Sequence, residues 1–223
     1  MKEEITNQII GKLISNTAWS ENADEQNSFA VAISETTKNF CVGIVDIANS
    51  TKIIAKLPPS KAASYYELFL NQMATILNKF GGVLIKNVGD SLLFCFPDPN
   101  VPKRKTSLIT FIECVLTMAE THTFLQEKYQ SEGLPTIDYR ISADYGSLSI
   151  MKFNSSSVDL IGTPVNICSK INLQAPVNGI IIGGDLHEIV KDFDGYYFKK
   201  AEPFSVGLKN SYPIYSLRRK YTS

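Results

Sequence analysis

The order of strand-like and helix-like segments is the feature that most restricts the folds open to this chain. Four β-rich runs occur at residues 39–47, 83–85, 92–96 and 137–151. Between them lie two long segments, 60–80 and 107–129, in which apolar residues recur at close to helical spacing. Gly81 and Gly82 stop the first of these helical segments. The predicted order is therefore strand, helix, strand, strand, helix, strand.

Shorter elements follow this core. The pattern predicts a helix at 162–174, a strand at 179–183, a helix at 185–191, and strands at 196–199 and 212–217. The order βαββαβ is that of the split βαβ arrangement found in ferredoxin-like folds. We therefore expect an α+β protein with a ferredoxin-like βαββαβ core and additional C-terminal αβ elements. Its sheet should have an antiparallel centre and carry the helices on one face.

The length of the chain favours a single core. With 223 residues, of which 44% are apolar, the chain is long enough for one well-packed domain. We expect an N-terminal helix and connecting arm at residues 1–38, the main domain at 39–217 and a C-terminal tail at 218–223.

The charge balance limits the class of partner. Twenty-two basic residues balance 22 acidic residues, so we expect no surface for nucleic acid or for an anionic membrane. No apolar run approaches the roughly 18 residues that span a bilayer. The cysteines never form a C-x-x-C pattern and are expected to be reduced core residues: Cys41, Cys95, Cys114 and Cys168. These features predict a cytoplasmic protein without a membrane segment.

Two acidic residues stand at the ends of predicted core strands. Asp46 ends the first strand, and Asp90 lies in the hairpin between the second and third strands. In a βαββ arrangement these two places are neighbours, so the carboxylates should face each other. Two such carboxylates repel unless positive charge lies between them, and a pair of divalent cations is the usual solution. The alternative is that each aspartate only caps a turn.

The segment after Asp46 supports the cation interpretation. The sequence IANST opens a helix, so the backbone N–H groups around Asn49, Ser50 and Thr51 form an anion site at a helix N-terminus. An acid pair, cations and a phosphate site together indicate phosphoryl transfer on a nucleotide.

Five segments share the order and spacing of one known family. They are VDIANST, IKNVGDS, YRISADYGSL, DLIGTPVNICSKI and VGLKNSYPIYSL, and they extend over about Asn39 to Leu217. In these segments the chain resembles the class III nucleotidyl cyclase catalytic domain. The resemblance implies a ferredoxin-like core and conversion of ATP or GTP into a 3′,5′-cyclic nucleotide and pyrophosphate. It also implies two Mg²⁺ or Mn²⁺ ions at the interface of a head-to-tail dimer.

The resemblance assigns the acidic residues to metal binding. Asp46 and Asp90 match the family's metal-binding aspartates, and the backbone carbonyl of Ile47 completes the shell of one ion. One ion then lowers the pKa of the ribose 3′-hydroxyl and the other holds the β- and γ-phosphates. The attack on the α-phosphorus is in line and needs no covalent enzyme intermediate. The expected phosphate-loop residues are Ser50, Thr51 and Asn49, the last standing where the family usually has glycine.

Lys86 and Asp159 match the family's purine-recognition pair. Adenine offers an acceptor at N1 and a donor at N6, which complement an ammonium and a carboxylate, whereas guanine reverses that edge. Guanylate-making relatives carry a glutamate and a small polar residue at these positions, so ATP is the expected substrate. The alternatives are a solvated hairpin lysine and an aspartate that caps a turn.

Positions in the C-terminal half of the chain complete the comparison. Asn166 matches the residue that orients the ribose, and Lys170 stands where the family usually has an arginine that stabilises charge on the α-phosphate. Lysine keeps the positive charge but lacks the planar guanidinium group, with which arginine donates two parallel hydrogen bonds. If Gly207 aligns with the glycine of the family's L-K-G triplet, Val206 replaces its triphosphate-binding lysine, and Lys209 is the candidate substitute.

The sequence leaves three functions open. The leading hypothesis is a homodimeric adenylate cyclase with two composite sites. In each site, one chain contributes Asp46 and Asp90. The other chain contributes Lys86, Asp159, Asn166 and Lys170. The second hypothesis, motivated by Val206 and Lys170, is a catalytically weak or inactive cyclase-like module that binds nucleotide and regulates a partner. The third is a guanylate cyclase.

Overall fold

The structure is a computed structural model that describes residues 31–98, 103–153, 157–203, 205 and 211–220. The helix predicted within residues 1–38 falls mostly outside this range, as do Val206, Gly207 and Lys209. The expected arm at 31–38 is instead the first part of strand β1.

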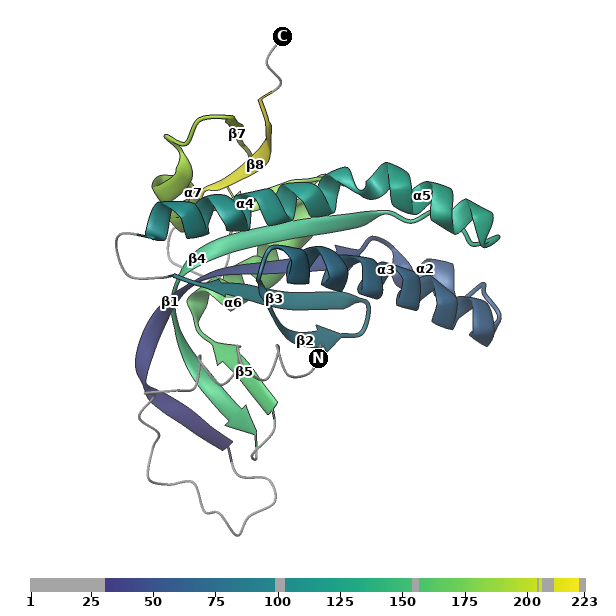
Figure 1. Ribbon diagram of the computed structural model, residues 1–223, viewed down its shortest axis with the longest axis horizontal. Coiled ribbons are helices and arrows are strands. Elements are labelled where there is room, and N and C mark those ends of the chain that lie inside the picture. Colours follow the sequence, from purple (N-terminus) through teal and green to yellow (C-terminus); the bar gives the residue numbers. More distant parts are fainter. Residues whose placement is uncertain (1–30, 99–102, 154–156, 204, 206–210, 221–223) are drawn as a thin grey trace.

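One sheet of eight strands forms the centre of the molecule (Figure 1). The strands are β1 (Val31–Ile47), β2 (Val83–Val88), β3 (Ser91–Pro97), β4 (Tyr139–Phe153), β5 (Ser157–Ile161), β6 (Ile180–Gly183), β7 (Tyr196–Lys200) and β8 (Ile214–Arg219). Their order is β2-β3-β1-β4-β6-β8-β7, and β5 pairs with β4. The first four positions are mutually antiparallel and reproduce the predicted ferredoxin-like core, while β6 continues the sheet parallel to β4. The predicted α+β fold is confirmed.

Six α-helices lie in the described part of the chain. They are α2 (Ser50–Ile54), α3 (Pro59–Lys79), α4 (Arg104–Glu120), α5 (His122–Ser131), α6 (Thr163–Ile171), which a 3-10 turn extends to Gln174, and α7 (Gly184–Val190). The single helix expected at 107–129 is thus two consecutive helices that meet at Thr121. Together they span 28 residues and are long and apolar enough to cross a membrane, yet their apolar face contributes to the central core. This is the behaviour of a core helix.

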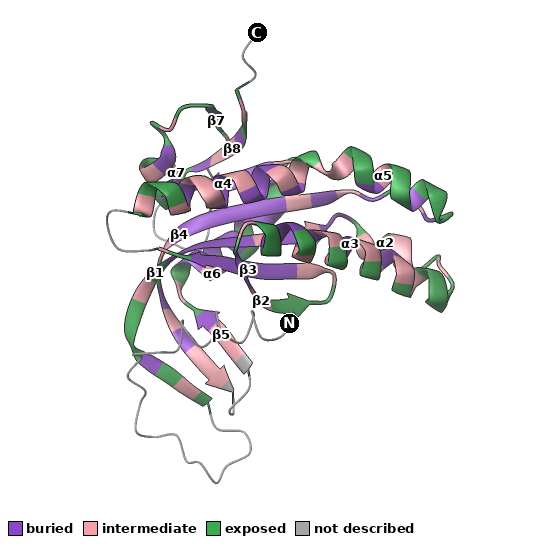
Figure 2. Ribbon diagram, in the orientation of Figure 1, coloured by how far each residue is buried: buried purple, intermediate pink, exposed green. Residues whose placement is uncertain are grey.

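The helices cover both faces of the sheet, so the prediction of helices on one face is wrong. Cys41 and Val45 of β1 belong to the core that α3, α4 and α5 form with the sheet. Phe40 and Val42, which alternate with them, belong to a second core with β5 and with Cys168 of α6. Figure 2 shows the central strands buried along most of their length. A strand covered on both faces reads as one continuous apolar run, which is why alternation could not reveal the second layer.

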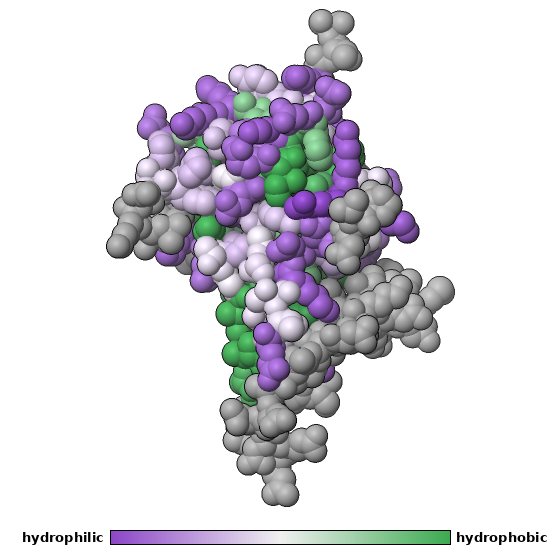
Figure 3. Space-filling model, turned by 90° about the vertical axis from the view of Figure 1, so that its left-hand side faces the viewer, coloured by the Kyte–Doolittle hydropathy of each residue, from purple (hydrophilic) through white to green (hydrophobic). Residues whose placement is uncertain are grey.

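The strands β1 and β4 extend beyond the body and form an arm with β5 (Figure 1). The β1–β4 register shifts between Ile33 and Thr37, where the Ser34 hydroxyl accepts a hydrogen bond from the Ile150 N–H at 2.9 Å. Val31 and Ile33 on this arm are each 43% exposed. Figure 3, which views this end of the molecule, shows apolar surface on its lower, projecting part. Strand β5 was not predicted, because its five residues follow a polar segment that reads as a loop.

Candidate active site

Asp46 and Asp90 lie beside each other, as the sequence predicted. Asp46 pairs with Ser91 across the β1–β3 ladder, and Asp90 is the preceding residue, in the turn between β2 and β3. Burial raises the pKa of Asp46 to about 6; the negative charge of Asp90 adds to this, and Arg140 opposes it. Each carboxylate is therefore within electrostatic reach of the other.

The turn that carries Asp90 is held by its own side chains. Gly89 has a positive φ of 62°, a conformation that glycine adopts without steric cost. The Asn87 amide donates to the backbone oxygens of Gly89 at 3.0 Å and Ser91 at 3.1 Å. The Ser91 hydroxyl donates to the Val88 carbonyl at 2.9 Å. These bonds fix the position of Asp90 relative to β1.

The predicted phosphate loop follows Asp46 directly. Asn49 is left-handed, with φ 58° and ψ 24°, and α2 begins at the next residue. Asparagine is several-fold enriched in this region of backbone space and, like glycine, can meet this backbone requirement. Ser50 and Thr51 form the first turn of α2.

Arg140 is a residue of this site that the sequence analysis missed. It lies directly opposite Asp46 in the β1–β4 ladder, and its Nε donates to the Ala175 carbonyl at 3.2 Å. Its positive charge lowers the pKa of Asp46 against the two opposing effects. The signal was present in YRISADYGSL, but only the strand register shows that this arginine faces the acid pair.

Lys86 and Asp159 form an ion pair between β2 and β5, with Lys86 Nζ 2.5 Å from Asp159 Oδ2. The other oxygen, Asp159 Oδ1, accepts a hydrogen bond from the Leu160 N–H at 2.8 Å. The Lys86 side chain is 43% exposed and that of Asp159 is 14% exposed. Lys86 therefore pairs with Asp159 and not with Asp90, although Lys86 and Asp90 share a hairpin.

A hollow of about 440 Å³ lies between Asp46 and Lys86 on the α6 face of the sheet. Asp46, Lys86 and Asn166 all line it. Its apolar lining consists of Ile44, Val88, Leu93, Val165 and Leu173. Asn172 also lines the hollow; its side chain is largely buried, and its Oδ1 has no hydrogen-bond partner among the described residues. An unpaired buried acceptor is costly, so this oxygen is available to a donor group of a ligand or to water.

The remaining predicted residues lie near the hollow or outside the described chain. Lys170 is an exposed residue in the last turn of α6, the helix that carries Asn166. Lys209, the candidate substitute for the triphosphate-binding lysine, falls outside the described residues.

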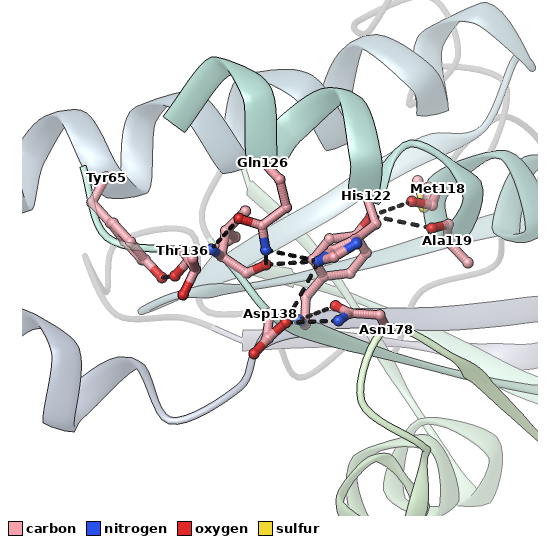
Figure 4. A network of polar contacts seen from close by, with 10 residues as sticks. Tyr65, Met118, Ala119, His122, Gln126, Thr136, Asp138 and Asn178 are labelled. Atoms are coloured by element: carbon pink, nitrogen blue, oxygen red, sulfur yellow. Dashed lines mark hydrogen bonds and ion pairs between the residues drawn. The ribbon is translucent and has the colours of Figure 1, made fainter. Parts of the chain in front are cut away.

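A polar network anchors the segment that leads into β4 (Figure 4). The Gln126 side chain of α5 donates to the Ile137 carbonyl at 2.7 Å and accepts from the Ile137 N–H at 3.3 Å. His122 Nε2 lies 3.0 Å from the same carbonyl and 3.5 Å from the Asp138 carboxylate. These contacts hold the segment before β4 against α5.

Asn178 joins this network from the other side. Its Nδ2 donates to the Asp138 carboxylate at 2.7 Å, and its Oδ1 accepts from the Tyr139 N–H at 3.1 Å. The Asp138 carbonyl in turn accepts from the N–H of Ala48 at 2.8 Å. Ala48 lies between Asp46 and Asn49, so the network positions both the end of β1 that carries Asp46 and the predicted phosphate loop.

The chemistry of the acid pair fits divalent cations. No group of three or more His, Cys, Asp or Glu residues that could hold a metal occurs in the described ranges, so this site has a two-carboxylate donor set. Carboxylate oxygens are the ligands that Mg²⁺ and Mn²⁺ prefer. Burial is the main cause of the raised pKa of Asp46 and the charge of Asp90 adds to it; a bound cation would oppose both effects.

The comparisons with known proteins identify the class. The family described as the adenylate and guanylate cyclase catalytic domain matches residues 32–219. Because the match covers most of the chain, the protein belongs to this family of nucleotidyl cyclases. Domains of the family bind a nucleotide substrate, use divalent metal ions and often form dimers.

Individual relatives differ in the nucleotide that their names specify. A cytidylate cyclase from Staphylococcus aureus is 24% identical over 166 residues, which cover 72% of this chain and 39% of that protein. An adenylate cyclase from Streptomyces coelicolor is 22% identical over 145 residues, which cover 65% of this chain and 32% of that protein. The matched part is thus well under half of each relative.

The fold agrees with a solved member of the family. The adenylyl cyclase CyaB from P. aeruginosa superposes with a TM-score of 0.75 at 21% sequence identity. The match covers 83% of this chain and 96% of that one.

Proposed function

We propose that the protein is an adenylate cyclase that converts ATP into 3′,5′-cyclic AMP and pyrophosphate. The observation that carries this proposal is the placement of two complementary groups on one face of the sheet. Asp46 with Asp90 offers carboxylates to cations, and Lys86 with Asp159 offers a donor and an acceptor to a base. The family supplies the reaction class.

Two divalent cations, Mg²⁺ or Mn²⁺, held by Asp46, Asp90 and the Ile47 carbonyl supply charge neutralisation for in-line attack on a phosphate. Asn49, Ser50 and Thr51 present backbone N–H groups to the phosphates. Arg140, which faces Asp46, adds a positive charge beside them. The Lys209 side chain is the proposed partner of the terminal phosphate.

The remaining residues orient the nucleoside. Lys86 and Asp159 hold the adenine edge, Asn166 orients the ribose, and Lys170 stabilises charge on the α-phosphate. In this arrangement the ribose 3′-oxygen forms a bond to the α-phosphorus, and the bond from that phosphorus to the β-phosphate oxygen breaks. Pyrophosphate leaves, and the 3′-hydroxyl proton passes to solvent.

We propose further that two copies of the chain form a head-to-tail homodimer with two composite sites. Leu173 is 71% exposed and Val88 is 56% exposed, and both line the hollow that holds Asp46 and Lys86. Exposed apolar side chains around a polar site favour a covering partner. In the dimer, the acid pair of one copy faces the base-reading pair of the other.

Incubation of the protein with ATP and Mn²⁺ tests the reaction. Cyclic AMP should appear, and Asp46→Ala or Asp90→Ala should reduce its formation to background, because each substitution removes a cation ligand. Thermal unfolding of each variant should remain cooperative. Activity that survives either substitution would show that the metal assignment is wrong.

Two other functions have specific support. Lys170, in place of the usual arginine, favours a weakly active or inactive regulatory module, which would bind ATP without turnover under any divalent cation. The name of the Staphylococcus aureus relative makes CTP a second candidate substrate. GTP is disfavoured by the Lys86–Asp159 pair, whose donor and acceptor do not match the guanine edge.

We also propose that the protein acts in the cytoplasm.

A further inference from the structure

Asn172 is a buried polar residue on the wall of the hollow. It begins the 3-10 turn Asn172–Gln174 at the end of α6, it is 4% exposed, and it lines the hollow together with Asp46. Its Oδ1 has no hydrogen-bond partner among the described residues. An unpaired buried oxygen destabilises a fold, so stability alone does not explain an amide at this position. The contacts of the amide nitrogen supply another reason.

The Asn172 amide lies over the part of the β1–β4 ladder that leads to Asp46. Its Nδ2 donates to Ser142 Oγ at 3.2 Å, to the Ile44 carbonyl at 3.4 Å and to the Arg140 carbonyl at 3.5 Å. The Ser142 hydroxyl donates its own hydrogen to a backbone carbonyl of α6 at 2.9 Å, so it accepts from Nδ2 and fixes which end of the amide faces the sheet. Ser142 pairs with Ile44 in the ladder. Arg140 pairs with Asp46, two residues further along.

The turn that Asn172 begins also holds the Arg140 side chain. Arg140 Nε donates to the Ala175 carbonyl at 3.2 Å, and the Ala175 N–H donates to the Asn172 carbonyl at 3.0 Å. One short turn thus contacts both the backbone and the guanidinium of Arg140. The two terminal nitrogens of this guanidinium form no hydrogen bond with a described residue, so they remain available to a ligand. Opposite Asp46, that ligand is a phosphate of the proposed nucleotide.

We propose that Asn172 is a positioning residue for Arg140, whose guanidinium it fixes in the orientation that binds the phosphates of the nucleotide. This inference rests on the proposed function and adds to it a residue that does not touch the phosphates itself. A guanidinium binds phosphate through parallel N–H donors in one plane, so its orientation matters more than that of an ammonium. Asn172 should therefore affect phosphate binding only where Arg140 is present.

A double-mutant cycle between Asn172→Leu and Arg140→Gln tests this dependence. The probe is inorganic pyrophosphate with Mg²⁺, titrated into the purified protein by calorimetry. Each single substitution should weaken pyrophosphate binding about 10-fold, and Asn172→Leu should add less than about twofold to Arg140→Gln, because no guanidinium is left to position. The matched control is Ser34→Ala, which removes a buried hydroxyl that accepts from the Ile150 N–H on the arm, and it should leave pyrophosphate binding unchanged.

Thermal unfolding shows whether each variant is folded, and Asn172→Ala takes the place of Asn172→Leu if the core does not accommodate leucine. Additive losses would overturn the inference, because Asn172 would then act independently of Arg140. An Arg140→Gln variant that binds pyrophosphate as tightly as the wild type, or a wild type that binds none, would overturn it as well.

The proposed function is tested separately by the formation of cyclic AMP. If cyclic AMP forms and the two losses are additive, the proposed function stands and this inference fails. If no cyclic nucleotide forms but the losses are not additive, the proposed function fails and the positioning role of Asn172 stands.

Discussion

Asp46 and Asp144 both have a pKa raised toward neutrality, but their surroundings differ. Burial raises the pKa of Asp46 to about 6, and the negative charge of Asp90 adds to the shift; the proposed cations would oppose it. Burial also raises the pKa of Asp144 to about 7, although its oxygens accept hydrogen bonds from the Tyr212 hydroxyl at 2.9 Å and from the Leu186 N–H at 3.3 Å. Asp144 is a fully buried residue of β4 whose side chain contacts the first turn of α7. Its role is to hold α7 and the segment around Tyr212.

The Asp144 carboxyl predicts a pH dependence of stability. Its pKa in the folded chain lies above the unfolded value, so its contribution is complete below pH 4 and is lost as pH rises through 7. Between pH 5 and pH 8 the wild type should lose about 2 to 3 kcal/mol relative to Asp144→Asn, which does not titrate. Denaturant unfolding of both proteins at the two pH values measures the difference. Parallel losses in the two proteins would show that Asp144 does not titrate in this range.

At the scale of elements, contacts at the start of β4 position the end of β1 that carries Asp46. Asn178 is left-handed, with φ 59°, and its side chain binds both Asp138 and Tyr139. The Asp138 carbonyl then binds the Ala48 N–H. No residue of this connection touches the hollow, so its effect on the site is one of positioning.

Asn178→Gly tests this connection, because glycine keeps the left-handed backbone and removes only the side chain. Loss of the two hydrogen bonds should cost about 1 to 3 kcal/mol of unfolding free energy. If the network positions the cation ligands, the Mn²⁺ concentration for half-maximal activity should also rise several-fold. A lower melting temperature with an unchanged Mn²⁺ dependence would show that Asn178 stabilises the fold but does not position the site.

The elements show how far local sequence pattern carries a prediction. The βαββαβ order, the neighbouring positions of Asp46 and Asp90, and the helix after Asp46 all followed from periodicity and chain order. Strand β5 and the second core layer under α6 did not, since β5 is short and the buried strands show no alternation. Arg140 and the His122 network depend on register and on contacts between distant segments. A pattern within one segment carries no information about such partners.

For the whole molecule, we predict that the α6 face takes part in self-association and that the face covered by α3, α4 and α5 does not. Leu173 is 71% exposed beside the hollow, and Phe124 is 52% exposed on α5. Leu173→Glu should shift the protein toward monomer in sedimentation velocity and reduce specific activity most at low protein concentration. Phe124→Glu places the same charge away from the proposed interface and should change neither. Equal effects of the two substitutions would locate the interface elsewhere.

The most direct test of a cyclase with composite sites is complementation between two inactive variants. Asp46→Ala lacks a cation ligand, and Lys86→Ala lacks the base-reading lysine, so each homodimer has two defective sites. A mixed dimer has one site with both defects and one site with none. Co-expression of the two variants with different affinity tags, followed by tandem purification, should therefore restore cyclic AMP formation to about half the wild-type rate per dimer, since one of two sites is intact. A mixed dimer that is as inactive as its parents would contradict the proposal that each site draws its cation ligands and its base-reading pair from different chains.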